Sequence, residues 1–285
     1  MTAAEPGRLL DIAVAAAAAA GRMLTAVRLP GRPEVVGTKS SPTDVVTEMD
    51  RASEEMIIGQ IRAARPGDSF LGEERGEEGA AAVSGAGLAG GASVRWIIDP
   101  IDGTVNYLYG LADWAVSIAA EQAGQIVAGV VHVPQRCEFF TAVRGGGAFL
   151  RLPGNAADAT RLRCAAGVPL GQALVATGFG YEAARRNVQG QVVAAVLPRV
   201  RDIRRGGSCA VDMCSVAAGR VDAYYERGIN YWDRAAGGLI AEEAGAQVAG
   251  LRGKPAGPGL TLAAGPGLFT ELHDLLVTLD PERDA

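Results

Sequence analysis

Two aspartates near the middle of the chain are spaced in a way that suits the binding of a divalent cation. Asp99 ends the apolar run 94–98, and Asp102 follows three residues later. Pro100 between them is expected to stop sheet pairing, so that Asp102 lies on a turn and both carboxylates converge on one point. Carboxylate and carbonyl oxygens are the ligands that Mg²⁺ prefers. Asp-Pro and Asp-Gly are also ordinary turn dipeptides, so the pattern alone leaves a structural explanation open.

A phosphate site is predicted directly after these carboxylates. Gly103 permits close approach of the backbone, and Thr104 opens an expected helix. The N-terminus of a helix presents free N–H groups and partial positive charge, which suit a phosphate. Water and the phosphate of a substrate would complete the coordination of Mg²⁺ at this point.

Other acidic residues stand where they could join this site or could be purely structural. Glu73 and Glu74 follow an apolar residue, but an acidic solvated loop would explain them as well. Asp233 lies at an expected helix start, where an N-cap is the simpler explanation. Asp44 and Asp50 flank the start of another expected helix, where they would complement its dipole. Taken singly, each of these acids has an ordinary structural role.

Histidine is nearly absent, which limits the possible chemistry. His132 lies in an apolar run expected to be a buried strand, and His273 lies in an expected terminal helix. A zinc site built on several histidines is therefore excluded, and we interpret both residues as structural. In an enzyme with this sequence, proton transfer and charge stabilisation would fall to carboxylates, hydroxyls and bound metal.

The composition is that of an ordinary globular protein without an excess of basic charge. The 285 residues are 48% apolar and 21% charged, and 27 basic against 32 acidic residues give a net charge of −5. Such a chain has no general basic field for nucleic acid or membranes, so neither is expected as a partner. The four cysteines form no closely spaced pair and are expected to be reduced, and the apolar run 12–20 is too short to span a bilayer. These features predict a soluble, cytoplasmic protein.

Helices and strands alternate along the chain and must position the acidic residues. Helices are expected at 8–28, 47–64, 181–197, 207–218, 233–244 and 268–279, and strands at 69–71, 94–98, 115–120, 126–133, 139–143, 148–150, 173–177, 200–203, 221–225 and 260–264. The segment 76–92 is rich in glycine and alanine and is expected to be a mobile surface loop. The alternation predicts an α/β fold, and we divide the chain into an N-terminal lobe, 1–153, and a C-terminal lobe, 154–285.

Taken together, the motifs resemble the inositol monophosphatase family of Mg²⁺-dependent phosphatases over nearly the whole chain. The matching segments stand in family order and at family spacing: 39–47, 72–74, 96–104, 222–226 and 231–237. The resemblance implies a layered αβαβα sandwich (α/β, or α+β) of the inositol monophosphatase and fructose-1,6-bisphosphatase type. It also implies a homodimer.

The resemblance further implies a metal site with two or three Mg²⁺ ions. Glu73, Asp99 and the backbone carbonyl of Ile101 would hold one ion. Asp99, Asp102 and Asp233 would hold the second, so that Asp99 bridges the two. A third, weaker ion is expected near Glu73. Two cations would neutralise the phosphate dianion, activate a water molecule and stabilise the departing oxygen.

Catalytic and substrate-binding residues are implied by the same resemblance. Thr104, paired with Asp50, would orient the attacking water and help to deprotonate it, together with Glu73 and with Lys39 in a mobile loop that closes over the site. The N–H groups of Gly103 and Thr104 would receive the phosphate. Gly207, Ser208 and Cys209 would line the pocket of the leaving group, and Glu226 would bind its hydroxyls.

The favoured activity is the hydrolysis of inositol 1-phosphate, an inositol-phosphate phosphatase activity that Li⁺ is expected to inhibit. Histidinol phosphate is the first alternative, because Glu226 could pair with its ammonium group. A bisphosphate would need further cationic contacts; the tract 201–205 is one source of these, although a solvated or dimer-facing role is favoured for it. Asn230 replaces a histidine of some relatives, and Cys209 a common alanine, which leaves the choice of substrate open. An alternative of another class is a regulatory interaction protein that uses the same fold.

Overall fold

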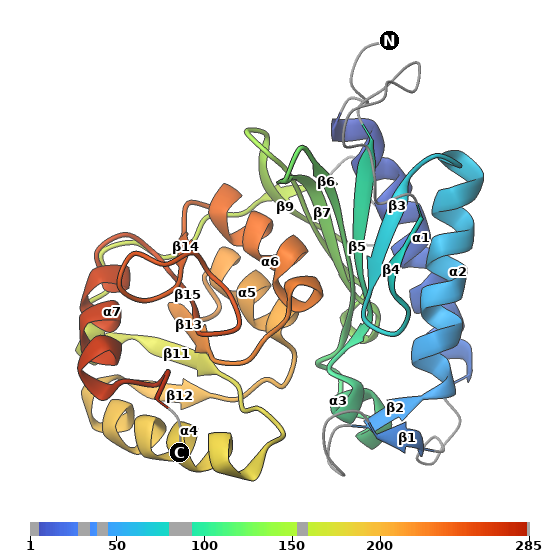
Figure 1. Ribbon diagram of the computed structural model, residues 1–285. Coiled ribbons are helices and arrows are strands. Elements are labelled where there is room, and N and C mark those ends of the chain that lie inside the picture. Colours follow the sequence, from blue (N-terminus) through green and yellow to red (C-terminus); the bar gives the residue numbers. More distant parts are fainter. Residues whose placement is uncertain (1–5, 28–34, 39–44, 80–92, 153–158, 284–285) are drawn as a thin grey trace.

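The computed structural model describes residues 6–27, 35–38, 45–79, 93–152 and 159–283, arranged in five layers of helices and sheets (Figure 1). Helices form the two outer layers and the middle layer. One outer layer consists of α1 (Pro6–Val27) and α2 (Glu48–Ala64). The middle layer consists of α5 (Cys209–Ala217) and α6 (Tyr231–Glu243). The other outer layer consists of α4 (Ala183–Val196) and α7 (Leu268–Leu279). The expected αβαβα sandwich is confirmed.

The first sheet lies between the α1–α2 layer and the α5–α6 layer. Within the described residues it has eight strands in the order β10-β9-β8-β7-β6-β5-β3-β4. Neighbouring strands are antiparallel except β3 and β5, which are parallel. Their bounds are β3 Ser69–Gly72, β4 Gly76–Glu78, β5 Val94–Asp102, β6 Ala115–Gln122, β7 Gln125–Val133, β8 Glu138–Val143, β9 Gly147–Arg151 and β10 Thr160–Arg161.

The second sheet lies between the α5–α6 layer and the α4–α7 layer. In the part of the chain that the structure describes, it has five strands in the order β12-β11-β13-β15-β14. The bounds are β11 Leu174–Thr177, β12 Asp202–Arg204, β13 Ala223–Glu226, β14 Gln247–Ala249 and β15 Thr261–Ala264. Strand β11 is parallel to both β12 and β13, so the carboxyl ends of β11 and β13 meet at one edge. Ligands of open α/β sheets bind at such edges.

Strand β5 does not end at Pro100, and this expectation from the sequence is wrong. The strand continues to Asp102, and its pairing with β6 shifts register between Asp99 and Asp102. Three residues of β5 advance there against two of β6, from Ser117 to Ala115. Such a bulge accommodates a residue without an N–H and turns the strand locally, so Pro100 is tolerated inside the sheet. Both aspartates therefore stand on one irregular strand end, without an intervening turn.

Other differences from the expected elements concern short strands. Gly76–Glu78, expected in a mobile loop, form β4 and pair with β3, while 80–92 lie outside the described residues. Val35–Thr38 and Val45–Thr47 form an antiparallel pair, β1 and β2, that periodicity did not reveal. Elements of two to four residues show too little alternation to be recognised from sequence.

Helix α3 (Thr104–Tyr109) and three short 3₁₀ turns, η1 (Pro134–Arg136), η2 (Leu170–Gln172) and η3 (Leu197–Arg199), complete the described elements. The two lobes proposed from the sequence divide at 153–158, outside the described residues. Strand β10, just beyond that division, pairs with β9, and the α5–α6 layer packs on both sheets. We propose that the two lobes are packed against each other without a break, through β10 and the α5–α6 layer.

Helix α1 is long and apolar enough to cross a membrane by length and composition, which the run 12–20 alone did not suggest. Core helices of soluble proteins satisfy the same criterion. Its buried residues include Leu9, Ala13, Ala17 and Leu24, and they pack against α2, β6 and β7. The small alanines allow the helix to lie close to the sheet, so we interpret α1 as a core helix.

His132 is confirmed as a structural residue of the first sheet. Its ring stacks on Phe139 with the ring centres 3.8 Å apart, and its Nδ1 lies 3.1 Å from the carbonyl oxygen of Glu138. A Cβ on Gly21 of α1 would lie 2.5 Å from the imidazole, so glycine is required where the helix crosses it. Burial lowers the pKa of His132 to about 4. His273, on α7, accepts a hydrogen bond from the Arg252 N–H, and its Nδ1 lies 2.9 Å from Oδ1 of Asp274.

The buried His132 is expected to make the protein less stable in mild acid. Its pKa is lower in the folded chain (about 4) than in the unfolded chain (6.5), so stability rises with pH between those two values. From pH 7 to pH 5 the wild type should lose about 2 kcal/mol more unfolding free energy than His132→Gln, by urea titration. His273→Gln is the control for loss of a histidine elsewhere. Equal losses in wild type and His132→Gln would contradict this assignment.

Candidate active site

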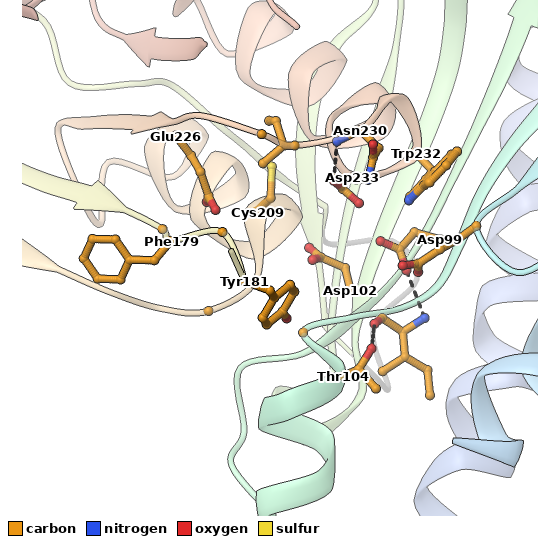
Figure 2. Close-up of a pocket in the computed structure, with 18 of the residues that line it drawn as sticks. Asp99, Asp102, Thr104, Phe179, Tyr181, Cys209, Glu226, Asn230, Trp232 and Asp233 are labelled. Atoms are coloured by element: carbon orange, nitrogen blue, oxygen red, sulfur yellow. Dashed lines mark hydrogen bonds between the residues drawn. The ribbon is translucent and has the colours of Figure 1, made fainter. Parts of the chain in front are cut away.

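Strand ends of both sheets and the N-termini of four helices, α3, α4, α5 and α6, surround one cavity of about 370 Å³. It opens where β5, β11 and β13 end and where these helices begin (Figure 2). The lining residues are Glu73, Asp99, Ile101, Asp102, Gly103, Thr104, Gly178, Phe179, Gly180, Tyr181, Glu182, Arg185, Arg205, Gly207, Cys209, Glu226, Gly228, Ile229, Asn230, Trp232 and Asp233. The cavity is thus built from segments far apart in the sequence.

Four carboxylates that the sequence singled out as metal ligands line this cavity. Figure 2 shows Asp99, Asp102 and Asp233 turned toward the same space, and Glu73 also lines it. Asp99 is only 1% exposed. Burial raises the pKa of Asp99 well above its usual range, and the negative charges of Glu73, Asp102 and Asp233 raise it further. A hydrogen bond to Glu73 acts in the same direction. The site is therefore strongly electronegative.

The spacing of these acids is wider than that of an assembled metal centre. Among the described residues, no three His, Cys, Asp or Glu side chains are gathered closely enough to hold a metal ion as they stand. The donor set nevertheless fits a hard divalent cation, because the charges acting most strongly on Asp99 are all carboxylates. Like charges in a buried site repel one another unless protons or a cation neutralise them. A bound cation would have to draw the carboxylates together.

Thr104 lies at the junction of the cavity and the first helical layer. Its Oγ1 is 3.2 Å from Oδ1 of Asp50 and 3.1 Å from the carbonyl oxygen of Ile101. A hydroxyl has one proton, so Thr104 donates to one of these acceptors at a time. Asp50, on α2, is fully buried behind Thr104 and does not line the cavity. The Ile101 N–H donates to Oδ1 of Asp99 over 3.1 Å, which fixes that carboxylate on the bulged strand.

Gly103 forms the tight connection from β5 to α3. Its φ is +94°, a conformation that favours glycine. A Cβ there would lie 3.1 Å from the carbonyl oxygen of Asp113 and 3.2 Å from that of Gly207, so the backbone approaches both of these segments closely at this residue. Asn106 links the same segments, because its Nδ2 donates to the Gly206 carbonyl over 2.8 Å.

Asp102 is held by the start of α5. Its Oδ2 accepts hydrogen bonds from Ser208 Oγ and from the Ala210 N–H, each over 2.6 Å. Burial raises the pKa of Asp102 to about 6, although these two bonds lower it. Ser208 also caps α5 by accepting from the Val211 N–H, is 1% exposed and is not among the lining residues. Of the three residues expected to line the pocket, Gly207 and Cys209 reach the cavity, whereas Ser208 orients Asp102.

Glu226 occupies the side of the cavity opposite Asp99 (Figure 2). The Tyr224 hydroxyl donates to its Oε2 over 2.8 Å. Burial raises the pKa of Glu226 to about 7, so both protonation states are populated near neutral pH. Gly178 packs directly against this carboxylate, and a Cβ at that position would overlap it. The predicted hydroxyl-binding acid therefore faces the same cavity as the predicted metal ligands, within reach of a small ligand.

One wall of the cavity was not predicted from the sequence. It comes from the β11–α4 connection, Gly178 to Glu182, with Arg185 in the first turn of α4, and from Trp232 on α6. The available signal was the Gly-rich segment directly after an expected strand, since loops at the carboxyl ends of parallel strands form ligand sites. Lys39, which the sequence placed in a closing loop, lies outside the described residues.

Several solved structures share this layered fold and are also similar to this chain in sequence. Mycobacterium tuberculosis SuhB has a TM-score of 0.79 and 38% identity, covering 98% of this chain and 99% of that one. Inositol monophosphatase from Anabaena has a TM-score of 0.78 and 31% identity, covering 96% and 97%. These neighbours place the chain in the class of αβαβα phosphatases.

The chain belongs to the inositol monophosphatase family, whose model matches residues 5–280. Members of this family are generally metal-dependent. "Inositol-1-monophosphatase SuhB" from Mycobacterium tuberculosis is 46% identical over 238 residues, which are 83% of this chain and 79% of that protein. "Nus factor SuhB" from Pasteurella multocida is 38% identical over 267 residues, 93% and 94% of the two chains. The names of the relatives thus point to a phosphatase family that also includes proteins named for a regulatory role.

Proposed function

We propose that this protein is a Mg²⁺-dependent phosphomonoesterase that hydrolyses inositol 1-phosphate to myo-inositol and phosphate. The observation that carries the proposal is the burial of Asp99 among three other carboxylates, on a strand end that also presents Thr104. Clustered buried carboxylates are unfavourable unless a cation joins them, and a phosphatase of this family uses such a cation. The relatives named inositol-1-monophosphatase support the substrate.

The proposed ligands follow the expectations from the sequence. Glu73, Asp99 and the Ile101 carbonyl would hold one Mg²⁺, and Asp99, Asp102 and Asp233 a second; a third, weaker ion would lie near Glu73. When bound, Mg²⁺ lowers the pKa of coordinated water and offsets the negative charge of the phosphate. Ser208 and the Ala210 N–H would keep the second oxygen of Asp102 occupied, leaving Oδ1 for the cation.

Residues of the chain itself would position the reactants. The Thr104 hydroxyl would accept a proton from the attacking water and pass its own proton to Asp50, with which it is already aligned at 3.2 Å. The N–H groups of Gly103 and Thr104 would receive the phosphate at the start of α3. Glu226 would bind ring hydroxyls, with Gly207 and Cys209 beside it. Lys39 remains proposed as part of a closing loop.

The test is a panel of phosphate-release assays with and without Mg²⁺, on inositol 1-phosphate and histidinol phosphate. We expect turnover only with Mg²⁺, a preference for inositol 1-phosphate, and inhibition by millimolar Li⁺. An equal or faster rate on histidinol phosphate would replace the substrate and keep the reaction. The absence of metal-dependent phosphate release from either ester would refute the proposal.

A regulatory interaction protein is the second candidate, and the relatives named Nus factor SuhB favour it. The two functions are separable, because partner binding would persist in a variant that has lost turnover. We also propose a homodimer in the cytoplasm, which sedimentation and cell fractionation would test.

Gly178→Ala is expected to impair binding of the leaving group. The added methyl would overlap the Glu226 carboxylate and displace it from its hydrogen bond with Tyr224. The KM for inositol 1-phosphate should rise about tenfold, since a displaced charged hydrogen-bond partner is worth about 1.5 kcal/mol. Gly190→Ala on α4, where a Cβ would meet open space, is the matched control. An unchanged KM in Gly178→Ala would show that Glu226 does not contact the substrate.

A further inference from the structure

Helix α2 carries three polar residues that are completely buried, although the helix belongs to an outer layer. Asp50, Ser53 and Glu54 are each 0% exposed. Residues three and four apart lie on one face of a helix, so these side chains point to the same side of α2. A polar group at such a buried position is unfavourable unless it is hydrogen-bonded. The partners of the three residues therefore show what this face of α2 does.

The first two partners belong to the end of β5 and the start of α3. Asp50 contacts the Thr104 hydroxyl over 3.2 Å. The Ser53 hydroxyl donates a hydrogen bond over 3.2 Å to the carbonyl oxygen of Pro100, which lies inside the β5 bulge. This face of α2 is thus bonded to the backbone that presents Asp99. The proposed mechanism gives Asp50 a role but leaves Glu54 without one.

Glu54 holds the turn that follows Glu73, between β3 and β4. Its Oε2 accepts a hydrogen bond from the Glu74 N–H over 2.9 Å, and its Oε1 accepts one from the Arg75 N–H over 3.0 Å. The Glu73 N–H itself donates to the carbonyl oxygen of Ile98 over 3.2 Å. Three successive N–H groups are therefore fixed, the first to β5 and the next two to α2.

Gly72 leaves room for this contact. A Cβ at that position would overlap the Glu54 carboxylate, which packs directly against the backbone that precedes Glu73. A larger residue at position 72 would push the carboxylate away from the two N–H groups. Gly72 and Glu54 are thus complementary parts of one contact, which can be broken from either side.

The turn that Glu54 holds directs Glu73 toward the other carboxylates. Glu73 lines the cavity, and its side chain is hydrogen-bonded to that of Asp99. Glu54 does not line the cavity. It can therefore influence an ion in the cavity only through the position of Glu73.

We propose that Glu54 is a positioning residue that sets the affinity of the Mg²⁺ ion held by Glu73, because it fixes the turn 73–75. The inference rests on the proposed function, since it takes Glu73 to be a metal ligand. Groups that orient the ligands of a metal typically contribute about 10- to 100-fold to its affinity. The ion assigned to Asp102 and Asp233 should be little affected, because those residues belong to other segments.

The test variants break the contact from its two sides. Glu54→Gln keeps the shape of the side chain but offers one acceptor oxygen to two N–H groups. Gly72→Ala displaces the carboxylate from the turn. The matched controls lie on the same helix: Glu55→Gln, at an exposed position, and Gly59→Ala, where a Cβ would meet open space.

Metal affinity is measured by Mn²⁺ calorimetry without substrate, and Glu73→Gln identifies the ion that depends on Glu73. Both test variants should weaken that ion about 10- to 100-fold, and the other ion less than about threefold. The Mg²⁺ concentration that gives half the maximal rate on inositol 1-phosphate should rise by the same factor, whereas saturating Mg²⁺ should restore most of kcat. Glu54→Gln should not weaken Mn²⁺ binding further in a Glu73→Gln background, since Glu54 acts only through Glu73.

Melting temperatures measured without metal separate this role from a purely structural one. Lower melting temperatures with unchanged metal affinity in the test variants would overturn the proposal, and so would an equal loss of affinity in Glu55→Gln. If Glu54→Gln does not fold, Gly72→Ala decides the result. If wild type binds Mn²⁺ but releases no phosphate, the proposed function fails, and the Mn²⁺ affinities still decide the role of Glu54. Wild type that binds no Mn²⁺ would overturn both.

Discussion

Asp99→Asn is expected to abolish phosphate release, with a fall in kcat of about 1000-fold or more. The side chain is fully buried, is surrounded by three carboxylates and would bridge both proposed cations. Asparagine keeps the shape of aspartate and removes its charge, so the site would lose its central ligand without a change in volume. The rate should be measured at saturating inositol 1-phosphate over a range of Mg²⁺ concentrations.

The same substitution is expected to leave the fold intact. Because burial and three like charges oppose ionisation of Asp99, its neutral analogue should not lower the melting temperature in the absence of Mg²⁺. Stabilisation by added Mg²⁺ should largely disappear in the variant. Asp11→Asn on the exposed face of α1 is the control and should retain both turnover and Mg²⁺ stabilisation. Substantial turnover in Asp99→Asn would show that the carboxylate is not a metal ligand.

Thr104→Ala is expected to lower kcat about 100- to 1000-fold, the usual contribution of a positioned acid–base group, with a smaller change in KM. The variant loses the hydroxyl that joins the cavity to Asp50. Thr104→Ser keeps that hydroxyl and should retain most of the rate, which separates proton transfer from packing. Measurements of kcat and KM for both variants provide the test.

Asp50 acts only through Thr104 in this account, and the two substitutions should not be additive. The double variant Thr104→Ala with Asp50→Asn should be about as slow as Thr104→Ala alone. Asp50 does not line the cavity, so we expect it to affect the rate only through Thr104. Additive losses of rate would mean that Asp50 has a role of its own. Melting temperatures of the single variants must be compared first, because Asp50 is fully buried.

Much of the acidic site was accessible from the sequence because its parts are local. Asp99, Asp102 and Thr104 lie within six residues of one another, so an apolar strand followed by a helix start was enough to bring them together. Glu73 and Asp233 could be joined to them only by resemblance to a family, since nothing in their local pattern distinguishes a ligand from a cap or a loop. The structure places both in the same cavity.

The sequence could not predict contacts that depend on how the two sheets face each other. Ser208 was expected in the substrate pocket, yet it bonds to Asp102, 106 residues away, because α5 points its N-terminus at the end of β5. Arg185 and Arg205 stand in a charged helix start and beside a short strand, where solvated arginines are ordinary. Their common position emerges only when the β11–α4 connection folds over Glu226.

Local backbone irregularity was also beyond sequence reasoning. Pro100 normally marks the end of sheet pairing, and the bulge that retains it within β5 arises from pairing with β6, which begins only at Ala115. This bulge sets the direction of the Ile101 carbonyl and N–H, which contact Thr104 and Asp99.

A crystal structure of the protein soaked in Mn²⁺, with anomalous diffraction measured at the manganese edge, tests the central assignment most directly. We expect two anomalous peaks inside the cavity, each about 2.2 Å from an Asp99 oxygen, with Glu73 on one side and Asp102 and Asp233 on the other. A cavity without anomalous density, with the four carboxylates still apart at saturating Mn²⁺, would contradict the account.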